Sequence, residues 1–289
     1  MNINSSFNLR DKEPENGVLY LVGTPIGNLS DISFRALNIL KNVFLIACED
    51  TRQTKKILSK YEFSNKLISF NKLNSTKKIK SIINLLKDGN SIALVSDAGL
   101  PGICDPGENL VKESKFNGID IICVPGASAL LTALVCSGYE TSKFIFEGFL
   151  PKKKIDREKL FLEIKYNKKT TVIYESPHRL LKTLNELKEH CGGEREMQVF
   201  REITKKHEEH IGGNIEEVIR FLKRKDILGE FTLVIKGSQI TKPKDFNEAY
   251  LKKEIHALLN AGLNLSSASK YLAKRENISK RTIYNLHNK

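Results

Sequence analysis

Short apolar runs alternate with helical patterns over the first 125 residues. Apolar residues are nearly continuous in the runs, as in GVLYLVG and SIALVS, which is typical of strands buried on both faces. We expect strands at 17–23, 43–48, 66–70, 91–96 and 119–124, and helices at 31–41, 51–61, 75–87 and from about 107. This order predicts an α/β domain with a mostly parallel sheet covered by helices.

The second half has a different pattern. Strands are expected at 144–149, 170–175, 196–202 and 230–237, with helices at 155–166, 177–190 and 214–223. Apolar and polar residues alternate more cleanly in this half, which predicts a sheet with one wetter face. Ser176 can cap the helix at 177–190, and Pro177 suits its first position. We therefore predict a disordered leader at 1–14 and two α/β domains at 15–125 and 126–238.

The last segment, 243–289, predicts a small helical tail. It contains three short amphipathic stretches, NEAYLKKEIHALLNAG, NLSSASKYLAKREN and SKRTIYNLHNK, broken at Gly262 and Asn277. This rhythm resembles a helix-turn-helix module. A simple helical cap on the body of the protein explains the same pattern.

Charge bears on the partners of the protein. The chain has 47 Lys and Arg against 34 Asp and Glu, a formal net charge of +13. Such a balance is typical of proteins that bind nucleic acid, although a lysine-rich proteome would give it too.

Other features of composition concern the compartment. No apolar run approaches the roughly 18 residues of a membrane span, and the polar start MNINSSFNLRDKEPENG lacks the apolar core of a signal peptide. The five cysteines are scattered without a C-x-x-C pair, which disfavours a disulfide scaffold or a zinc site. We expect a cytoplasmic protein without a membrane segment.

Three glycine-bearing loops follow predicted strands, at 22–28, 96–102 and 124–129. Open α/β sheets bind ligands at the carboxyl ends of their strands, so three such loops predict a small-molecule cleft. The chain has neither G-x-x-x-x-G-K-[ST] nor G-x-G-x-x-G, which disfavours ordinary nucleotide sites. Asp97, directly after a buried strand, could accept hydrogen bonds from a ligand, or could serve a turn or a helix cap.

Long motifs identify a family. TPIGNLSDISFRAL, ACEDTRQT, ALVSDAGLPGICDPG, VPGASALLTAL, FEGFLP, YESPHRLL and REITKKHEE occur in this order. Over roughly residues 17–237 the chain resembles the small-subunit ribosomal RNA (cytidine-2′-O)-methyltransferases, in the tetrapyrrole-methylase-like group of S-adenosylmethionine enzymes. Two departures are Leu100, where threonine is common, and FNKLNST (70–76) in place of a histidine-rich segment.

The resemblance implies two α/β domains with S-adenosylmethionine in the cleft between them, no metal, and a homodimer. The expected substrate is small-subunit ribosomal RNA (16S), free or in the 30S particle, methylated on a cytidine ribose. The motifs assign cofactor binding to eight residues: Pro25, Ser96, Asp97, Gly99, Leu100, Ser128, Ala129 and Tyr174.

A base near the ribose hydroxyl would assist methyl transfer. Asp50, at the ligand edge of the first sheet, and Glu175 and His178, at a strand–helix junction of the second domain, are the candidate catalytic residues. Helix dipole, capping or packing roles are the alternatives.

RNA contacts are expected from polar residues near the strand ends, namely Asn28, Arg35, Arg52, Arg179, Arg201 and Lys205. A run of lysines, Lys152–Lys154, is a further phosphate-contacting candidate. Helix caps, ion pairs and solvated surface are the structural alternatives. Two other functions stay open: a small-molecule (tetrapyrrole) methylase with the same fold, and a non-catalytic RNA-binding assembly factor.

Overall fold

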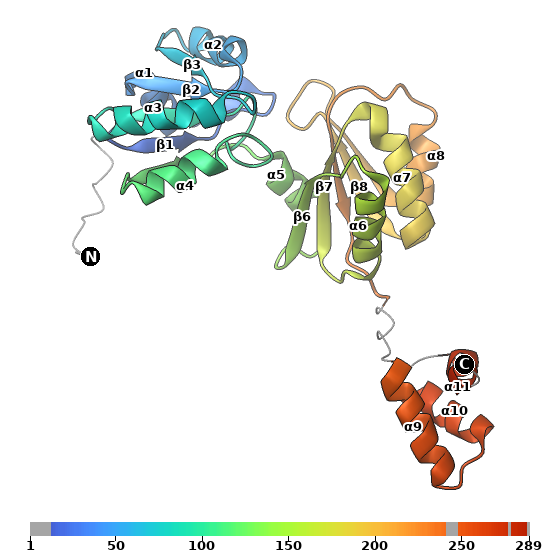
Figure 1. Ribbon diagram of the computed structural model, residues 1–289. Coiled ribbons are helices and arrows are strands. Elements are labelled where there is room, and N and C mark those ends of the chain that lie inside the picture. Colours follow the sequence, from blue (N-terminus) through green and yellow to red (C-terminus); the bar gives the residue numbers. More distant parts are fainter. Residues whose placement is uncertain (1–12, 241–247, 277–278, 288–289) are drawn as a thin grey trace. The chain divides into compact units, whose positions relative to one another are not determined.

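The computed structural model describes residues 13–240, 248–276 and 279–287 (Figure 1). The chain divides into two compact units, Met1–Gly237 and Ser238–Lys289. Most of the predicted leader, residues 1–12, lies outside the described residues.

The first sheet of the larger unit is parallel, in the order β3-β2-β4-β1-β5. Helices α1 and α2 pack on one face and α3 and α4 on the other, because each helix has one apolar stripe. This confirms the doubly covered parallel sheet. The strands are β1 (Leu19–Val22), β2 (Leu45–Cys48), β3 (Leu67–Ser69), β4 (Ile92–Val95) and β5 (Ile121–Val124), and the helices are η1 (Leu29–Asp31), α1 (Phe34–Asn42), α2 (Thr51–Lys60), α3 (Ser75–Lys87) and α4 (Glu108–Phe116).

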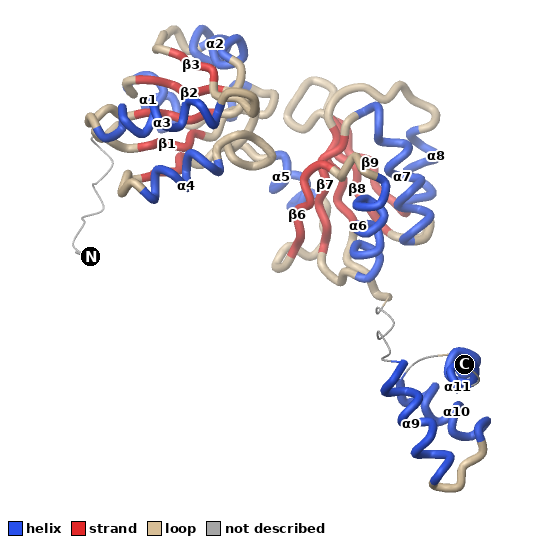
Figure 2. The backbone as a smooth tube through the Cα atoms, in the orientation of Figure 1, coloured by secondary structure: helices blue, strands red, loops and turns tan. Residues whose placement is uncertain are grey.

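The second sheet, whose strands are drawn in red in Figure 2, is mixed and has the order β6-β7-β10-β8-β9. Only β6 and β7 pair in parallel, and the other neighbours are antiparallel. Helices α6, α7 and α8 pack on one face, and α5 covers part of the other. The strands are β6 (Phe144–Phe149), β7 (Thr170–Glu175), β8 (Glu196–Arg201), β9 (Glu209–Asn214) and β10 (Phe231–Ile235), and the helices are α5 (Ala129–Cys136), α6 (Lys154–Tyr166), α7 (Pro177–Cys191) and α8 (Ile215–Leu222).

Three details of the second sheet correct the sequence prediction. The expected wetter face is wrong at β10, where all five residues are buried, because α5 packs against this central strand. Strand β9 (EHIGGN) and helix α5 were not predicted, since two glycines weaken a strand pattern and α5 is short and almost uniformly apolar. Ser176 precedes Pro177 at the start of α7 as expected, but its side chain forms no capping hydrogen bond.

The smaller unit contains the three predicted helices, α9 (Glu248–Asn260), α10 (Leu265–Glu276) and α11 (Lys280–His287). They enclose a small core formed by Leu251, Ile255, Leu272, Ile283 and Leu286. Across the described parts of the chain, no helix has the length and apolar character needed to cross a membrane.

Candidate functional site

The three glycine-bearing loops meet at one edge of the first sheet. They follow β1, β4 and β5, which are neighbours in the order β4-β1-β5, so parallel pairing brings their carboxyl ends together. The first two loops are joined backbone to backbone, because Thr24 N–H donates to Gly99 O (2.9 Å) and Gly99 N–H donates to Thr24 O (3.1 Å). The edge predicted to hold a ligand is therefore one continuous surface.

Two glycines allow the first and third loops to touch. A Cβ atom on Gly23 would lie 2.7 Å from Gly126 Cα, and a Cβ on Gly126 would lie 2.7 Å from Gly23 Cα. Neither position can carry a side chain unless a backbone segment moves. Close loop packing is thus the physical reason for glycine at both positions.

A cavity of about 570 Å³ opens at this edge and extends to the second sheet. This volume suits a medium-sized organic ligand. Of the eight predicted cofactor residues, six line the cavity: Asp97, Gly99, Leu100, Ser128, Ala129 and Tyr174. The structure therefore brings together predicted residues from the second and third loops of the first sheet and from a strand of the second.

Pro25 and Ser96 are the two that do not line the cavity. The Ser96 hydroxyl is buried and donates to the carbonyl oxygens of Ala98 and Gly99, both at 3.2 Å. Its role in the structure is therefore to shape the second loop.

One wall of the cavity is acidic, with Glu49, Asp97 and Asp105. Burial raises the pKa of Glu49, and the charges of Asp105 and Asp97 raise it further. Burial also raises the pKa of Asp105, with Asp97 adding to the effect. Asp97 is itself oriented, since its Oδ1 accepts a hydrogen bond from Asp50 N–H (3.0 Å). This wall suits a ligand with cationic or hydrogen-bond-donating groups.

A second wall of the cavity is aromatic, with Phe149 and Tyr174. The ring of Tyr174 packs against Phe146 and Phe149, with centroids 4.9 and 5.7 Å away. Its hydroxyl oxygen accepts a hydrogen bond from Leu130 N–H (3.1 Å) at the start of α5. Burial raises the pKa of Tyr174 to about 12, so the phenol stays neutral at physiological pH.

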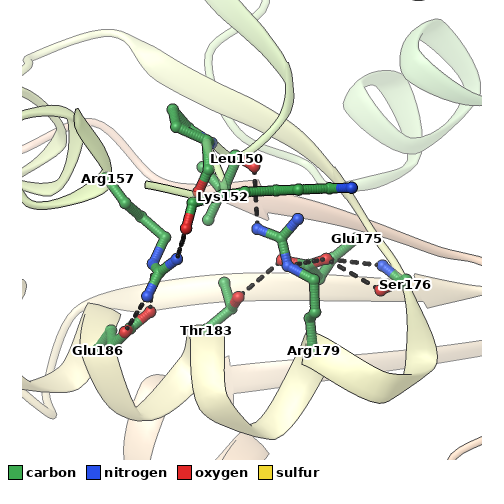
Figure 3. Close-up of polar contacts among 9 residues, drawn as sticks. Leu150, Lys152, Arg157, Glu175, Ser176, Arg179, Thr183 and Glu186 are labelled. Carbon is green, nitrogen blue, oxygen red and sulfur yellow. Dashed lines mark hydrogen bonds and ion pairs between the residues drawn. The ribbon is translucent and has the colours of Figure 1, made fainter. Parts of the chain in front are cut away.

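Glu175 also lines the cavity, and its carboxylate belongs to a polar network (Figure 3). The residue is 2% exposed, and its carboxylate accepts hydrogen bonds from Ser176 N–H (2.8 Å) and Thr183 Oγ1 (2.6 Å). Arg179 Nε lies 3.4 Å from Glu175 Oε1, and Arg179 Nη2 donates to Leu150 O (2.9 Å). Both carboxylate oxygens of Glu175 therefore have partners. This is expected for a residue that positions its neighbours rather than for a free general base.

The other two predicted catalytic residues lie outside the cavity lining. His178 is exposed on the first turn of α7. Asp50 caps α2 and pairs with Arg52 (2.7 Å), whose hydrogen bonds lower the pKa of Asp50 to about 2. The structure does not bring Asp50, Glu175 and His178 into one catalytic group.

All six predicted RNA-binding residues have protein partners. Asn28 Oδ1 accepts a hydrogen bond from Ser30 N–H (3.1 Å). Five basic residues form ion pairs: Arg35 with Glu13, Arg52 with Asp50, Arg179 with Glu175, Arg201 with Glu209, and Lys205 with Glu202 and Glu230. Of these five, Arg52 is the most exposed, at 85% of its side chain.

Sequence reasoning missed several residues of the cavity. Asp105 lies eight residues after Asp97 in the motif ALVSDAGLPGICDPG, and Phe149 lies in the motif FEGFLP. Glu49 lies directly before Asp50 in ACEDTRQT, where the sequence predicts carboxylates at the ligand edge, but no cofactor role is assigned to it there. For Asp105 a signal was present, namely a carboxyl group beside a predicted ligand loop. The segment 229–232, which also lines the cavity, carried no signal.

The chain is similar to characterised families and proteins. The family described as Tetrapyrrole (Corrin/Porphyrin) Methylases matches residues 18–219. A Thermotoga maritima protein named "Ribosomal RNA small subunit methyltransferase I" is 49% identical, over 77% of this chain and 100% of its own length. A protein of the same name from Synechocystis is 42% identical over 93% of this chain and 97% of its own.

A solved structure has the same fold. The uroporphyrin-III C-methyltransferase of Thermus thermophilus, crystallised with S-adenosylhomocysteine, matches 75% of this chain and 96% of its own with a TM-score of 0.54 and 16% identity.

Proposed function

Because the chain belongs to the tetrapyrrole (corrin/porphyrin) methylase family, we propose that it transfers a methyl group from S-adenosylmethionine to a cytidine ribose 2′-hydroxyl of small-subunit (16S) ribosomal RNA. One observation carries the proposal: the glycine-loop cavity lies in a chain 42% identical, over 93% of its length, to a ribosomal RNA small subunit methyltransferase. The net charge of +13 supports an RNA substrate.

The cavity fits this cofactor. S-adenosylmethionine has a cationic sulfonium and an ammonium group, and Glu49, Asp97 and Asp105 supply negative charge in one wall. Ile26 and Leu100 offer apolar surface for the adenine ring. Gly99 presents no side chain to the cavity, and Ser128 and Ala129 at the start of α5 bring backbone N–H groups close to it, where they can bind the polar edges of the ligand. Pro25 and Ser96 would support the loops from outside.

The bound cofactor would supply an electrophilic methyl group. The chain itself has to orient the ribose hydroxyl and accept its proton as the new C–O bond forms and the S–C bond breaks. We assign the proton acceptor to Asp105, because it lines the cavity and burial raises the pKa of its carboxyl group, which makes it a stronger base than an ordinary aspartate. Glu175 would act by positioning Arg179 and the strand end that carries Tyr174.

The smaller unit would add affinity for RNA. Helices α10 and α11 contain Lys270, Lys274, Arg275, Lys280 and Arg281 against a single acidic residue, Glu276. Tyr271 and Tyr284 are 52% and 40% exposed on the same helices and could stack on bases. The Thermotoga relative, whose full length matches only 77% of this chain, suggests that about a quarter of the chain is accessory to the methyltransferase.

We further propose a cytoplasmic homodimer. Helix α5 supports dimerisation, because Val135 is 70% exposed on an apolar helix. Light scattering of the purified protein would test the dimer, and Val135→Lys should shift it toward the monomer. Among the arginines, Arg52 is the best candidate for a phosphate contact because its side chain is the most exposed.

A labelling experiment tests the proposed activity. The protein, labelled S-adenosylmethionine and either naked small-subunit RNA or 30S particles should give label at one cytidine after nuclease mapping. Asp105→Asn should lower the methylation rate by about 10²-fold or more, the range of a lost general base, with cofactor affinity much less affected. Label on a tetrapyrrole but on no RNA would overturn the proposal.

A further inference from the structure

A lysine-rich loop begins where the aromatic wall of the cavity ends. Strand β6 ends at Phe149, which lines the cavity and is 55% exposed. The chain continues through Leu150 and Pro151 into the lysine loop, Lys152–Lys154, and α6 starts at its last residue. All three lysines are exposed. A run of positive charge therefore begins three residues after Phe149, the cavity-lining residue at the end of β6.

Two arginines hold the backbone just before and within this loop. Arg157 Nη1 donates to Pro151 O and Lys152 O, both at 3.3 Å. Arg179 Nη2 donates to the preceding carbonyl, Leu150 O, at 2.9 Å. Three consecutive carbonyl groups therefore accept hydrogen bonds from guanidinium groups of α6 and α7 (Figure 3).

Each arginine is in turn fixed by a carboxylate. Arg157 donates twice to Glu186, from Nε to Oε2 (2.9 Å) and from Nη2 to Oε1 (2.7 Å), and its side chain is only 8% exposed. Arg179 pairs with Glu175, whose side chain is fully buried. A buried ion pair is weak evidence for stability, but a bidentate pair sets the direction of a guanidinium group closely. Here that direction is toward the carbonyl groups of the loop.

The lysines themselves are left available. Among the described residues, neither Lys152 nor Lys153 has an acidic partner, and Lys154 Nζ lies 3.7 Å from Glu158 in an exposed pair. The predicted RNA-binding arginines, in contrast, are engaged with carboxylates of their own. The loop thus combines a fixed backbone with two ammonium groups, those of Lys152 and Lys153, that form no ion pair among the described residues.

We propose that the lysine loop binds phosphates of the RNA strand whose ribose enters the cavity, and that Arg157 and Arg179, held by Glu186 and Glu175, are positioning residues for this loop. The inference rests on the proposed RNA substrate and assigns the surface that binds the flanking phosphates. It also gives Arg179 a role different from direct RNA contact. Fixing the loop before binding reduces the entropy that would otherwise be lost when RNA binds.

Substitution of Glu186 distinguishes two effects on RNA binding: the positioning of the lysine loop by Arg157 and the long-range attraction of RNA by net positive charge. Glu186→Gln weakens the hold on Arg157 and makes the protein more positive by one charge. Long-range attraction alone predicts tighter RNA binding, whereas a loosened lysine loop predicts weaker binding, by about 3- to 10-fold at moderate salt. The matched control is Glu189→Gln, which makes the same charge change at an exposed position of α7 and should leave affinity unchanged or slightly higher.

The phosphate contacts are tested separately, by the affinity for RNA and its salt dependence. Lys152→Ala and Lys153→Ala should each lower RNA affinity and reduce the slope of log affinity against log salt by up to about 0.9 for duplex-like and 0.7 for single-stranded contacts. Affinity for S-adenosylmethionine, measured by calorimetry, should stay at the wild-type value in all four variants. If Glu186→Gln fails to fold, Arg157→Lys replaces it, since an ammonium group keeps the charge but cannot bridge Glu186 and two carbonyl groups.

The outcomes distinguish this inference from the proposed function. If the wild-type protein binds and methylates no RNA, the proposed function fails first. If it methylates RNA while both lysine variants keep the wild-type affinity and salt slope, the lysine loop is not the phosphate-binding surface. Equal or tighter RNA binding by Glu186→Gln would overturn the positioning role. Lysine variants that lose binding to a ribosomal protein, but not to RNA, would assign the loop to a protein partner instead.

Discussion

Replacing Asp97 by asparagine should lower cofactor affinity and raise the stability of the unliganded protein. The variant Asp97→Asn removes one charge from the acidic wall of the cavity and keeps an oxygen that can accept the hydrogen bond from Asp50 N–H. The loop should therefore keep its conformation. Only the charge presented to the ligand and to Glu49 and Asp105 changes.

The size of the binding effect follows from the chemistry of the lost contact. A hydrogen bond to a charged group contributes about 1.5–3 kcal/mol, which corresponds to roughly 10- to 150-fold in affinity. S-adenosylmethionine carries a positive sulfonium that S-adenosylhomocysteine lacks. We therefore expect Asp97→Asn to weaken binding of the sulfonium ligand more than that of the neutral thioether.

The sign of the stability effect follows from linkage. The pKa values of Glu49 and Asp105 are raised in the folded protein, partly by Asp97. The stability that these groups contribute is fully present below their unfolded pKa, near 4, and is lost as pH rises through the folded pKa. With Asp97 neutral, the pKa values of Glu49 and Asp105 rise less on folding, so less stability is lost as the pH increases. The variant should unfold at a higher temperature than wild type near pH 7, and the gain should disappear toward pH 4.

Calorimetry with both ligands and thermal unfolding between pH 4 and 8 measure these two effects. The control is Asp120→Asn, which removes an exposed charge just before β5, at the opposite edge of the same sheet. It should change neither affinity. Wild-type affinity for S-adenosylmethionine in a folded Asp97→Asn protein would refute the assignment of Asp97, and a lower unfolding temperature than that of the control would refute the repulsion argument.

Three further predictions concern packing and the smaller unit. Gly126→Ala places a Cβ atom 2.7 Å from Gly23 Cα, so it should lower the free energy of unfolding by about 1–3 kcal/mol and weaken cofactor binding; unchanged urea denaturation would contradict the close packing of the two loops. Tyr174→Phe removes the acceptor for Leu130 N–H and should lower the free energy of unfolding by about 1 kcal/mol; equal denaturation midpoints of the variant and the wild-type protein would contradict this. Truncation after Gly237 separates the two compact units and should preserve calorimetric affinity for S-adenosylmethionine while lowering RNA affinity in filter binding; loss of cofactor binding by a folded truncation would assign the smaller unit to the cavity instead.

The sequence by itself determined the first sheet and the ligand edge. Apolar runs long enough for strands, separated by amphipathic helices, leave few arrangements other than a covered parallel sheet. The glycine-bearing loops follow their strands directly, so their position at one edge depends on local sequence and on the parallel pairing of neighbours. Asp97 could be placed in the cavity for this reason, since it is two residues beyond the end of β4.

Only the tertiary structure decided which charged groups face a ligand and which face the protein. The periodicity around Glu175, Arg179 and Arg35 is that of any strand–helix junction, and nothing in it shows that Glu175 is enclosed by Ser176 and Thr183 or that Arg35 meets Glu13. The same holds for Arg157, whose partners are a carboxylate on another helix and two carbonyl groups of a loop. A charged side chain is oriented by whichever group packs within about 3 Å of it, and long-range packing, not the neighbouring sequence, chooses that group.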